Sequence, residues 1–327
     1  MKTRAALVDQ PGRISIVEKE ISCAPDEVMV KNTAIGICGS DKNIFCGKMP
    51  PSTTEFRHPP TYPFPLGHES GGEIVEIGRR VNNFNIGDRV ISFGWNNNFA
   101  DYFTAKEWQL QPAPESFNER ETALGEPTAC AVFSAMNAGI RLGDVVTVIG
   151  CGFAGQVIVQ CAKKMGASMV IAVDPSDAKR KVAKRFGADV VLHPEDDICS
   201  ASGKVSSEAG SDVVVECAGS ESSMNLASEI VARNGRIVLY SWITEPVRLN
   251  ISRWHDDGIS IVTTCLVHHT WHERYVWAQK ALRPVEQKIL DIMPYIEVEF
   301  RLDEIQRAFE HACSGKEEAP IKTLILP

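Results

Sequence analysis

The sequence feature that most constrains the fold is a glycine-rich turn between a strand-like run and a helical pattern. Val145 to Ile149 form an apolar run, the hexapeptide Gly150-Cys151-Gly152-Phe153-Ala154-Gly155 follows directly, and Gln156 to Met165 have helical spacing. Three glycines at this spacing are weak evidence alone. A strand before them and a helix after them, however, place backbone amides around a bound pyrophosphate. The pattern therefore predicts a dinucleotide site. Its predicted contacts are Gly150, Gly152, Phe153, Ala154 and Gly155.

A carboxylate stands at the end of the next expected strand. Met169 to Val173 form that strand, and Asp174 follows it, just before a charged helical segment from Ser176 to Phe186. A carboxylate in this position accepts hydrogen bonds from both adenosine ribose hydroxyls and repels a 2′-phosphate. Asp174 therefore favours NAD over NADP, and we expect Lys179 to add a donor to the same ribose. Arg180 leaves NADP binding open.

Strand-like and helical patterns alternate after Asp144. Further strands are expected at Val190–Leu192, Val213–Val215, Arg236–Tyr240 and Ile259–Thr263, and a further helix at Glu221–Arg233. Alternation of this kind predicts an α/β fold with a doubly wound parallel sheet and helices on both faces. After about Thr264 the order changes. Helices are expected near Glu273–Ala281 and Leu302–Ala312, and strands at Glu297–Arg301 and Ile321–Leu326.

The first 110 residues have a β-rich pattern instead. Strand-like runs such as Glu27–Thr33 and Gly72–Ile77 are separated by Gly, Pro and Asn clusters. Met49 to Pro65 contains so many prolines that we expect an irregular surface loop there rather than a strand or helix. A chain of 327 residues also suggests about two domains, and a boundary is expected near Gln111 to Glu121.

Charge and composition exclude several classes of protein. The formal net charge of −8 argues against a nucleic-acid backbone or an anionic membrane as the main partner. The first residues lack the apolar core of a secretory signal, and the uncharged run between Asp144 and Lys163 is better explained by the strand and helix above than by a membrane span. The ten cysteines show no C-x-x-C spacing, which indicates a reducing, cytoplasmic location and thiols used mainly for packing.

Two short polar segments stand out in the β-rich half. They are Gly36-Ile37-Cys38-Gly39-Ser40-Asp41 and Gly67-His68-Glu69-Ser70-Gly71-Gly72. A single Cys and a single His mean little alone, because a zinc site needs several such ligands. Taken with its other motifs, the chain resembles the zinc-dependent medium-chain dehydrogenase/reductase family, in particular its sorbitol, threonine and polyol dehydrogenase branch. The other motifs that carry this resemblance are Gly87-Asp88-Arg89-Val90, Phe99-Ala100-Asp101-Tyr102, Glu126-Pro127, the glycine turn and Asp174.

The resemblance implies a fold and an assembly. Its members have a catalytic domain with a GroES-like β-barrel core, interrupted by a Rossmann NAD-binding domain, with the active site in the cleft between them. On this basis we expect residues 1–125 and 267–327 to form the catalytic domain and residues 126–266 the Rossmann domain. Because Rossmann domains of this family commonly pair along an unprotected sheet edge, we also expect a homodimer or homotetramer.

The resemblance also implies a metal site. Carried over to this chain, the zinc ligands fall on Cys38 and His68, and the remaining carboxylate position falls on Glu69 or Glu126. One thiolate, one neutral imidazole and one carboxylate neutralise Zn²⁺, which still acts as a Lewis acid. We therefore expect only one of the two glutamates to contact zinc firmly at a time, with the other acting through water or by exchange. Ser40 matches the hydroxyl that receives the substrate's proton.

The chain departs from its relatives in two places. Many relatives continue the proton relay with a histidine, where this sequence has Lys42-Asn43-Ile44. Relatives often carry four closely spaced cysteines that bind a structural zinc, but no cysteine occurs here between Cys46 and Cys130. We therefore expect one catalytic zinc per chain and no structural zinc. The thiols of Cys46, Cys130 and Cys217 are expected to serve packing.

The sequence says less about the substrate. The loop Trp95-Asn96-Asn97-Asn98-Phe99 would suit a polyhydroxylated molecule, although Asn-rich stretches are as typical of turns. Further candidates are Trp242, Trp254, His255, His268, His269, Trp271 and His272. We expect an oxidoreductase that transfers a hydride between NAD and a secondary alcohol or ketone, such as a polyol, sugar, cyclitol or amino alcohol. A zinc-free quinone or enoyl reductase of the same fold, and a non-catalytic nucleotide-binding protein, stay open.

Overall fold

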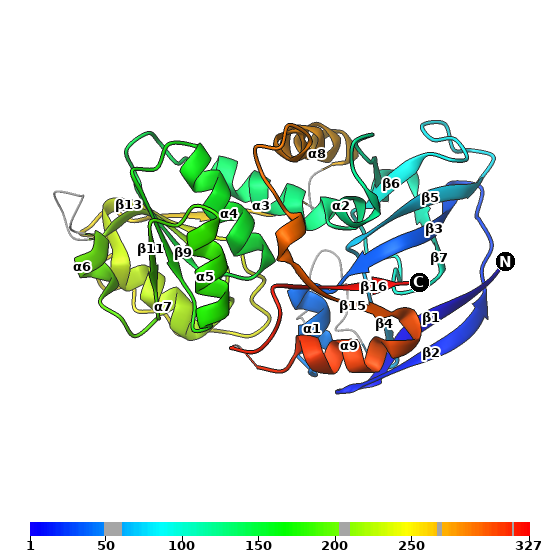
Figure 1. Ribbon diagram of the computed structural model, residues 1–327, viewed down its shortest axis with the longest axis horizontal. Coiled ribbons are helices and arrows are strands. Elements are labelled where there is room, and N and C mark those ends of the chain that lie inside the picture. The colour runs from blue at the N-terminus through cyan, green and yellow to red at the C-terminus, as the bar shows by residue number, and fades with distance from the viewer. Residues whose placement is uncertain (49–60, 203–209, 267–269, 316) are drawn as a thin grey trace. The chain divides into compact units, whose positions relative to one another are not determined.

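The structure of the chain is a computed structural model, which describes residues 1–48, 61–202, 210–266, 270–315 and 317–327 (Figure 1). The chain folds into two units. Unit 1 comprises Met1–Ala129, His269–Ser314 and Lys322–Pro327, and unit 2 comprises Cys130–His268 and Gly315–Ile321. Each unit is therefore assembled from segments that are far apart in the sequence.

Unit 2 contains the parallel sheet that the alternating pattern predicts. Within the described residues its strand order is β11-β10-β9-β12-β13-β14. The strands are β9 (Val145–Ile149), β10 (Met169–Val173), β11 (Val190–Leu192), β12 (Ser211–Glu216), β13 (Val231–Leu239) and β14 (Ser260–Thr263). The helices are α4 (Phe153–Lys164), α5 (Asp177–Arg185), α6 (Ile198–Ser202) and α7 (Glu221–Ile230). Figure 1 shows α4 and α5 on one side of these strands and α7 on the other. The doubly wound α/β prediction is confirmed.

Buried apolar side chains explain why these runs become central strands. All five residues of β9 are buried, as a strand covered on both faces requires. At two positions after β9 the backbone geometry requires glycine. Gly150 has a φ of +94°, a conformation that other residues rarely adopt, and a Cβ on Gly155 would collide with the carbonyl oxygen of Gly150. The helix expected to run to Arg233 ends at Ile230, because Val231 already pairs with Ser211 as part of β13.

Unit 1 is mainly β-structure. In the described part of the chain, one sheet has the order β2-β1-β4, and a larger one has the order β15-β16-β3-β5-β6-β8 with β7 also paired to β3. The small sheet consists of β1 (Lys2–Gln10), β2 (Arg13–Glu20) and β4 (Phe64–Pro65). The large sheet consists of β3 (Glu27–Gly36), β5 (Ser70–Ile77), β6 (Arg89–Ser92), β7 (Tyr102–Lys106), β8 (Leu110–Pro112), β15 (Ile296–Arg301) and β16 (Lys322–Leu326).

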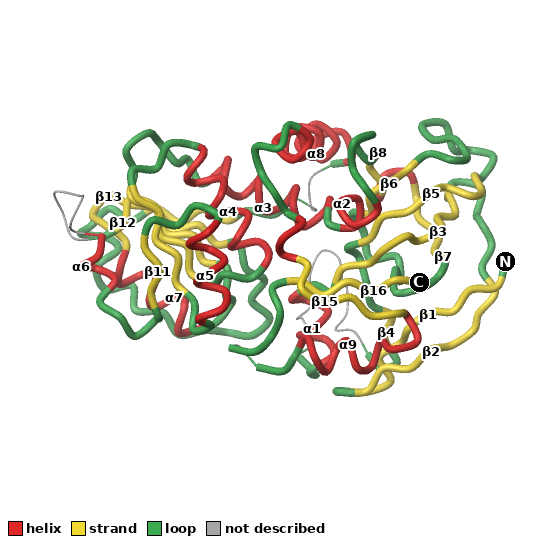
Figure 2. The backbone as a smooth tube through the Cα atoms, in the orientation of Figure 1, coloured by secondary structure: helices red, strands yellow, loops and turns green. Residues whose placement is uncertain are grey.

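Helices and a buried apolar cluster complete unit 1. The helices are α1 (Gly39–Phe45), α2 (Glu119–Ala123), α8 (Trp271–Glu286), α9 (Ile305–Ala312) and α3 (Gly125–Asn137), whose first residues belong to this unit. Figure 2 shows α9 beside α1 and next to β2. Phe309 of α9 anchors this packing, because its ring lies 5.1 Å from that of Phe45 and 5.5 Å from that of Phe99. The helix expected from Leu302 begins as the short 3₁₀ turn Leu302–Glu304 before α9.

One expectation about the proline-rich segment is wrong in part. Phe64 and Pro65 form the short strand β4, which pairs with Val8 and Leu7 of β1. Proline is tolerated there because β4 is an edge strand and needs no amide donor on its outer side. Residues 49–60 of the same segment lie outside the described part of the chain. No described helix has the length and apolar character needed to cross a membrane.

Candidate metal centre and cofactor site

Strand pairing brings the two polar segments of unit 1 together. Cys38 follows β3 and caps the start of α1, and His68 and Glu69 immediately precede β5. The two strands are antiparallel neighbours: Ile35 pairs with Ser70, and the amide of Gly36 donates to the carbonyl of Glu69 at 2.8 Å. One potential ligand atom from each of Cys38, His68 and Glu69 lies within 4.8 Å of the others. A sulfur, an imidazole nitrogen and a carboxylate oxygen match the donors that zinc prefers.

The carboxylate of Glu69 has a buried counter-ion from the last strand. Lys322 Nζ lies 2.5 Å from Glu69 Oε2 and also donates to the carbonyl of Ile37 at 3.2 Å. Both side chains are almost completely buried. Burial alone would raise the pKa of Glu69, but Lys322 and then His68 hold that pKa below its usual value. Burial likewise opposes the charge of Lys322, and the carboxylate of Glu69 nevertheless raises its pKa.

Gly36 leaves room for this arrangement. A Cβ at residue 36 would overlap with the Glu69 carboxylate, so glycine is needed where β3 passes the acid.

Asp41 links the two segments that carry the potential ligands. Its carboxylate accepts hydrogen bonds from the amide of Cys38 at 3.0 Å and the amide of Gly67 at 3.3 Å. Its Oδ1 lies 3.7 Å from His68 Nδ1, beyond hydrogen-bond distance. Burial opposes a charge on His68, yet Asp41 and then Cys38 raise its pKa well above the usual value. The same negative surroundings favour a divalent cation.

The site passes a simple test for a metal ion. His68 Nδ1 is buried and has no hydrogen-bond partner among the described residues. A buried donor or acceptor left without a partner is costly, and a metal ion offers one kind of partner for a ring nitrogen. The cluster of Cys38, His68 and Glu69 thus combines suitable donors, burial and negative charge.

The other predicted residues of unit 1 lie at different places. Ser40 is in the first turn of α1, and its Oγ is buried without a hydrogen-bond partner in the described part of the chain. Glu126 is buried in the first turn of α3 and acts electrostatically on Lys322. It is not part of the cluster formed by Cys38, His68 and Glu69 within the described residues. The structure therefore brings three of the four candidate ligands together.

Asp174 is held firmly at the end of β10 in unit 2. Its Oδ2 accepts from the amide of Cys151 at 2.7 Å, and its Oδ1 accepts from the amide of Ser176 at 2.8 Å. Arg180 donates to the carbonyls of Asp174 and Pro175 at 2.6 and 2.7 Å. Each carboxylate oxygen keeps a second lone pair, so the group can still accept bonds from ribose hydroxyls.

Gln156 and Ser176 tie the neighbouring segments to this acid. Gln156 Nε2 donates to the carbonyls of Cys151 and Lys179 at 3.1 and 2.9 Å. Ser176 caps α5 and donates to the carbonyl of Glu317 at 2.8 Å, so the segment Gly315–Ile321 borders the same region of unit 2. The glycine turn and the start of α5 are therefore held together around Asp174.

The substrate candidates lie in different surroundings. The Trp95 ring lies 4.4 Å from that of His68, next to the potential metal ligand. Asn98 and Phe99 belong to the interior instead: Asn98 donates to Ser70 Oγ at 2.7 Å, and Phe99 packs in the apolar cluster with Phe309. Trp254 is also structural, because its Nε1 donates to Ser228 Oγ at 2.6 Å. His255 and His272 are exposed, whereas His268 and His269 lie outside the described residues.

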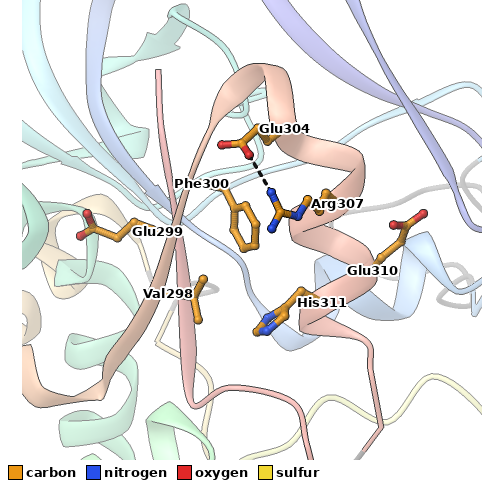
Figure 3. Close-up of a pocket in the computed structure, with 7 residues that line it drawn as sticks. All are labelled: Val298, Glu299, Phe300, Glu304, Arg307, Glu310 and His311. Carbon is orange, nitrogen blue, oxygen red and sulfur yellow. Dashed lines mark hydrogen bonds and ion pairs between the residues drawn. The ribbon is translucent and has the colours of Figure 1, made fainter.

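A separate surface pocket of about 500 Å³ lies between β15 and α9 (Figure 3). Its charged lining groups already have partners: Arg307 pairs with Glu304 at 3.1 Å, Gln306 donates to Glu310 at 2.8 Å, and Glu299 pairs with Arg120. None of the predicted site residues lines it, so we assign it no part in the chemistry.

Lys322 is a residue of this site that the sequence did not predict. The signal that could have found it is a single lysine at the head of the apolar run Thr323–Leu326, since a buried strand position rarely holds a charge without a partner. The identity of that partner, however, is visible only in three dimensions, because Lys322 and Glu69 are far apart in the chain.

Comparisons with known proteins agree with this arrangement. Residues 24–166 match the alcohol dehydrogenase GroES-like domain, and residues 154–280 match the zinc-binding dehydrogenase family. The chain is 27% identical to a sorbitol dehydrogenase of Halalkalibacterium halodurans, covering 97% of this chain and 96% of that protein. It is 27% identical to an L-threonine 3-dehydrogenase of Caldanaerobacter subterraneus, covering 92% of each. It also shares its fold with a Sinorhizobium meliloti protein solved with bound NADP, at 24% identity, a TM-score of 0.83 and complete coverage of both chains.

Proposed function

Because this chain belongs to the zinc-dependent medium-chain dehydrogenase family, we propose that it oxidises a secondary alcohol, or reduces the corresponding ketone, with NAD and one catalytic zinc ion. The observation that carries the proposal is the convergence of Cys38, His68 and Glu69 in a buried, negatively charged site of unit 1. A zinc-free quinone or enoyl reductase would have no use for such a cluster. The glycine turn and Asp174 of unit 2 supply the dinucleotide site.

Cys38 and His68 would hold the metal, and a carboxylate would complete the protein ligands. A zinc ion bound there supplies a Lewis acid that lowers the pKa of an alcohol or polarises a carbonyl. Lys322 already neutralises Glu69. We therefore propose that Glu69 contacts the metal only when its ion pair with Lys322 is broken. While the ion pair is intact, Glu126 or water would occupy that coordination position. Both glutamates thus stay candidate ligands, of which one serves at a time.

Ser40 would receive the substrate's proton. Its buried Oγ lacks a hydrogen-bond partner among the described residues and lies two positions after Cys38, in the turn that Asp41 holds in place. A hydroxyl positioned in this way can accept the proton of an alcohol and pass it onward. The neighbouring Lys42-Asn43-Ile44 contains no histidine to continue the relay, so we propose a water path beyond Ser40.

The preference for NAD rests on Asp174. Its carboxylate is fixed by the amides of Cys151 and Ser176, and it retains acceptor capacity for two ribose hydroxyls. A 2′-phosphate would face this negative charge. Lys179 is proposed to contribute a donor to the same ribose. The relative solved with NADP shares the fold, so the distinction has to be tested on this chain.

Sorbitol and threonine dehydrogenases among the relatives suggest the class of substrate. We propose a polyol, sugar, cyclitol or amino alcohol, with Trp95 forming an apolar wall beside His68. The test is a panel of such alcohols assayed with NAD and NADP on protein of measured zinc content. Reduction of NAD by at least one of them supports the proposal. Zinc-free protein that reduces quinones or enoyl compounds would favour the alternative, and zinc-loaded protein inactive on every compound would favour a non-catalytic role.

The remaining proposals concern metal number, assembly and location. With no cysteine between Cys46 and Cys130, we propose one zinc per chain and no structural zinc. The edge strand β14 exposes its residues, including Ile261, which supports pairing with a second copy in a homodimer or homotetramer. All ten cysteines lie in the described part of the chain and none is in a disulfide, which fits a cytoplasmic protein.

A further inference from the structure

We propose that Cys46 and Cys313 are a reversible disulfide site that links the end of α1 to the end of α9. Cys46 caps the carboxyl end of α1, and Cys313 caps that of α9. The two helices lie side by side (Figures 1 and 2). They pack through Phe45 and Phe309, whose rings are 5.1 Å apart. Cys46 follows the first of these rings directly, and Cys313 lies one helical turn after the second, so both cysteines lie beside the same helix–helix contact.

The backbone around this pair is fixed by hydrogen bonds to a common turn. The amide of Gly12 donates to the carbonyl of Phe45 at 2.7 Å. From the other side, Gln306 of α9 donates to the carbonyl of Gly12 at 3.1 Å and accepts from the amide of Ile14 at 2.8 Å. The turn between β1 and β2 therefore holds both helices. The ends of both helices are therefore anchored to the same short segment of the chain.

The two thiols differ in exposure, which allows them to react with a disulfide oxidant one after the other. Cys46 is exposed, whereas Cys313 is partly buried and packs against the apolar cluster around Phe309. The two thiols lie close enough for the charge of Cys46 to act on Cys313. Burial, and then the charge of Cys46, raise the pKa of Cys313 to about 12, while Lys42 acts in the opposite direction. Cys46 is therefore the thiol that meets an oxidant first, and it is not simply a packing residue as its sequence context suggested.

A small disulfide such as oxidised glutathione supplies the oxidant. The thiolate of Cys46 attacks one glutathione sulfur, the glutathione S–S bond breaks, and one glutathione thiolate leaves. This step removes the negative charge beside Cys313. The thiol of Cys313 then loses its proton to solvent or to the departing thiolate and attacks the sulfur of Cys46, which releases the second glutathione. In sum, two protein thiols become one disulfide and oxidised glutathione becomes two reduced molecules.

The cysteine pair is connected to the proposed metal centre through α1, although neither cysteine is a proposed metal ligand. Helix α1 begins directly after Cys38 and ends at Phe45, so the disulfide would fasten the far end of the helix whose start carries the potential ligand. The proposal does not depend on the dehydrogenase activity, because the thiol chemistry can be followed in its absence.

The experiment treats the full-length, zinc-supplemented protein with oxidised glutathione and analyses non-reduced peptides by mass spectrometry. The wild type should yield a linked Cys46–Cys313 peptide as the main product of Cys46, and dithiothreitol should reverse it. Cys313→Ser should instead accumulate a glutathione adduct on Cys46. Cys265→Ser, which removes another exposed thiol, should behave as the wild type.

Three results would overturn the proposal. One is a glutathione adduct on Cys46 that persists in the wild type as it does in Cys313→Ser. Another is a link between Cys46 and a different cysteine as the main product. The third is no reaction at Cys46 although Cys265 is modified in the same sample.

Discussion

The ammonium group of Lys322 lies 2.5 Å from Glu69 Oε2, and both side chains are buried beside the potential metal ligands. This pair joins the last strand of the chain to the segment before β5 and neutralises a carboxylate next to the metal centre. We therefore propose that Lys322 is a positioning residue, which would act on a bound metal through Glu69 rather than by contact with substrate.

Lys322→Met should destabilise unit 1 and alter metal binding. Removing one partner of a buried ion pair leaves an uncompensated charge and costs about 3 to 5 kcal/mol. Glu69, released from its counter-ion, should then bind zinc more firmly and reduce the Lewis acidity of the site. Chemical denaturation measures the first effect and kcat with a polyol the second. Lys322→Arg, the matched control, should retain most of both. A Met variant as stable as the wild type would contradict the role of the pair.

Ser40→Ala should lower kcat by about 100-fold and leave KM nearly unchanged, because the hydroxyl acts on the proton and not on binding. Ser40→Thr, which keeps the hydroxyl, should retain more activity. The measurement is the steady-state rate over a range of pH. Equal losses in both variants would mean that the site is sensitive to shape rather than to the hydroxyl.

Asp174→Ala should reduce the ratio of kcat/KM for NAD over NADP by about 10 to 100-fold, since it removes the acceptor for the ribose hydroxyls and the charge that repels a 2′-phosphate. Asp177→Ala, which removes an exposed carboxylate at the start of the next helix, is the matched control and should leave the ratio unchanged. An unchanged ratio in Asp174→Ala would refute the assigned role.

The ion pair between Arg4 and Asp101 gives a pH-dependent contribution to stability. The side-chain hydrogen bond from Arg4 at 2.7 Å is the main reason that the pKa of Asp101 lies below its usual value of 3.8. A lowered carboxyl pKa stabilises the fold above the pKa of the unfolded chain, and this contribution disappears as the pH falls through the folded-state pKa. Because both groups are partly exposed, Asp101→Asn should cost only about 0.5 to 1 kcal/mol at pH 7.

Denaturation of wild type and Asp101→Asn at several pH values checks this. The difference between them should shrink below about pH 4. A difference that is constant down to pH 2 would show that the charge of Asp101 is not its source.

The fold of unit 2 could be predicted from local patterns, because its central strands are short, continuous runs of apolar residues. In the glycine turn, for example, the positive φ of Gly150 and the close approach of Gly155 to the carbonyl of Gly150 are constraints that arise within the turn itself. The end of α7 at Ile230 was not predictable in the same way, because Val231 leaves the helix to pair with Ser211 of a distant segment.

In unit 1 the resemblance, rather than local periodicity, pointed to Cys38 and His68. The structure shows that they meet Glu69, but their roles stay predictions, as do the domain boundaries at residues 125 and 266. Residue type alone did not show the surroundings of Asn98. Its amide is able to bind a substrate, but in the fold it lies in the interior and donates to Ser70. The partner of Lys322 could be found only from the pairing of β16 with β3, which no local pattern encodes.

The most direct test of the account is the zinc content of purified protein. The wild type should hold one zinc ion per chain, Cys38→Ser and His68→Ala should hold almost none, and Cys130→Ser, which alters a thiol outside the cluster, should still hold one. Wild-type protein without zinc after supplementation, or single variants at Cys38 and His68 that retain a full equivalent, would contradict the proposed metal centre.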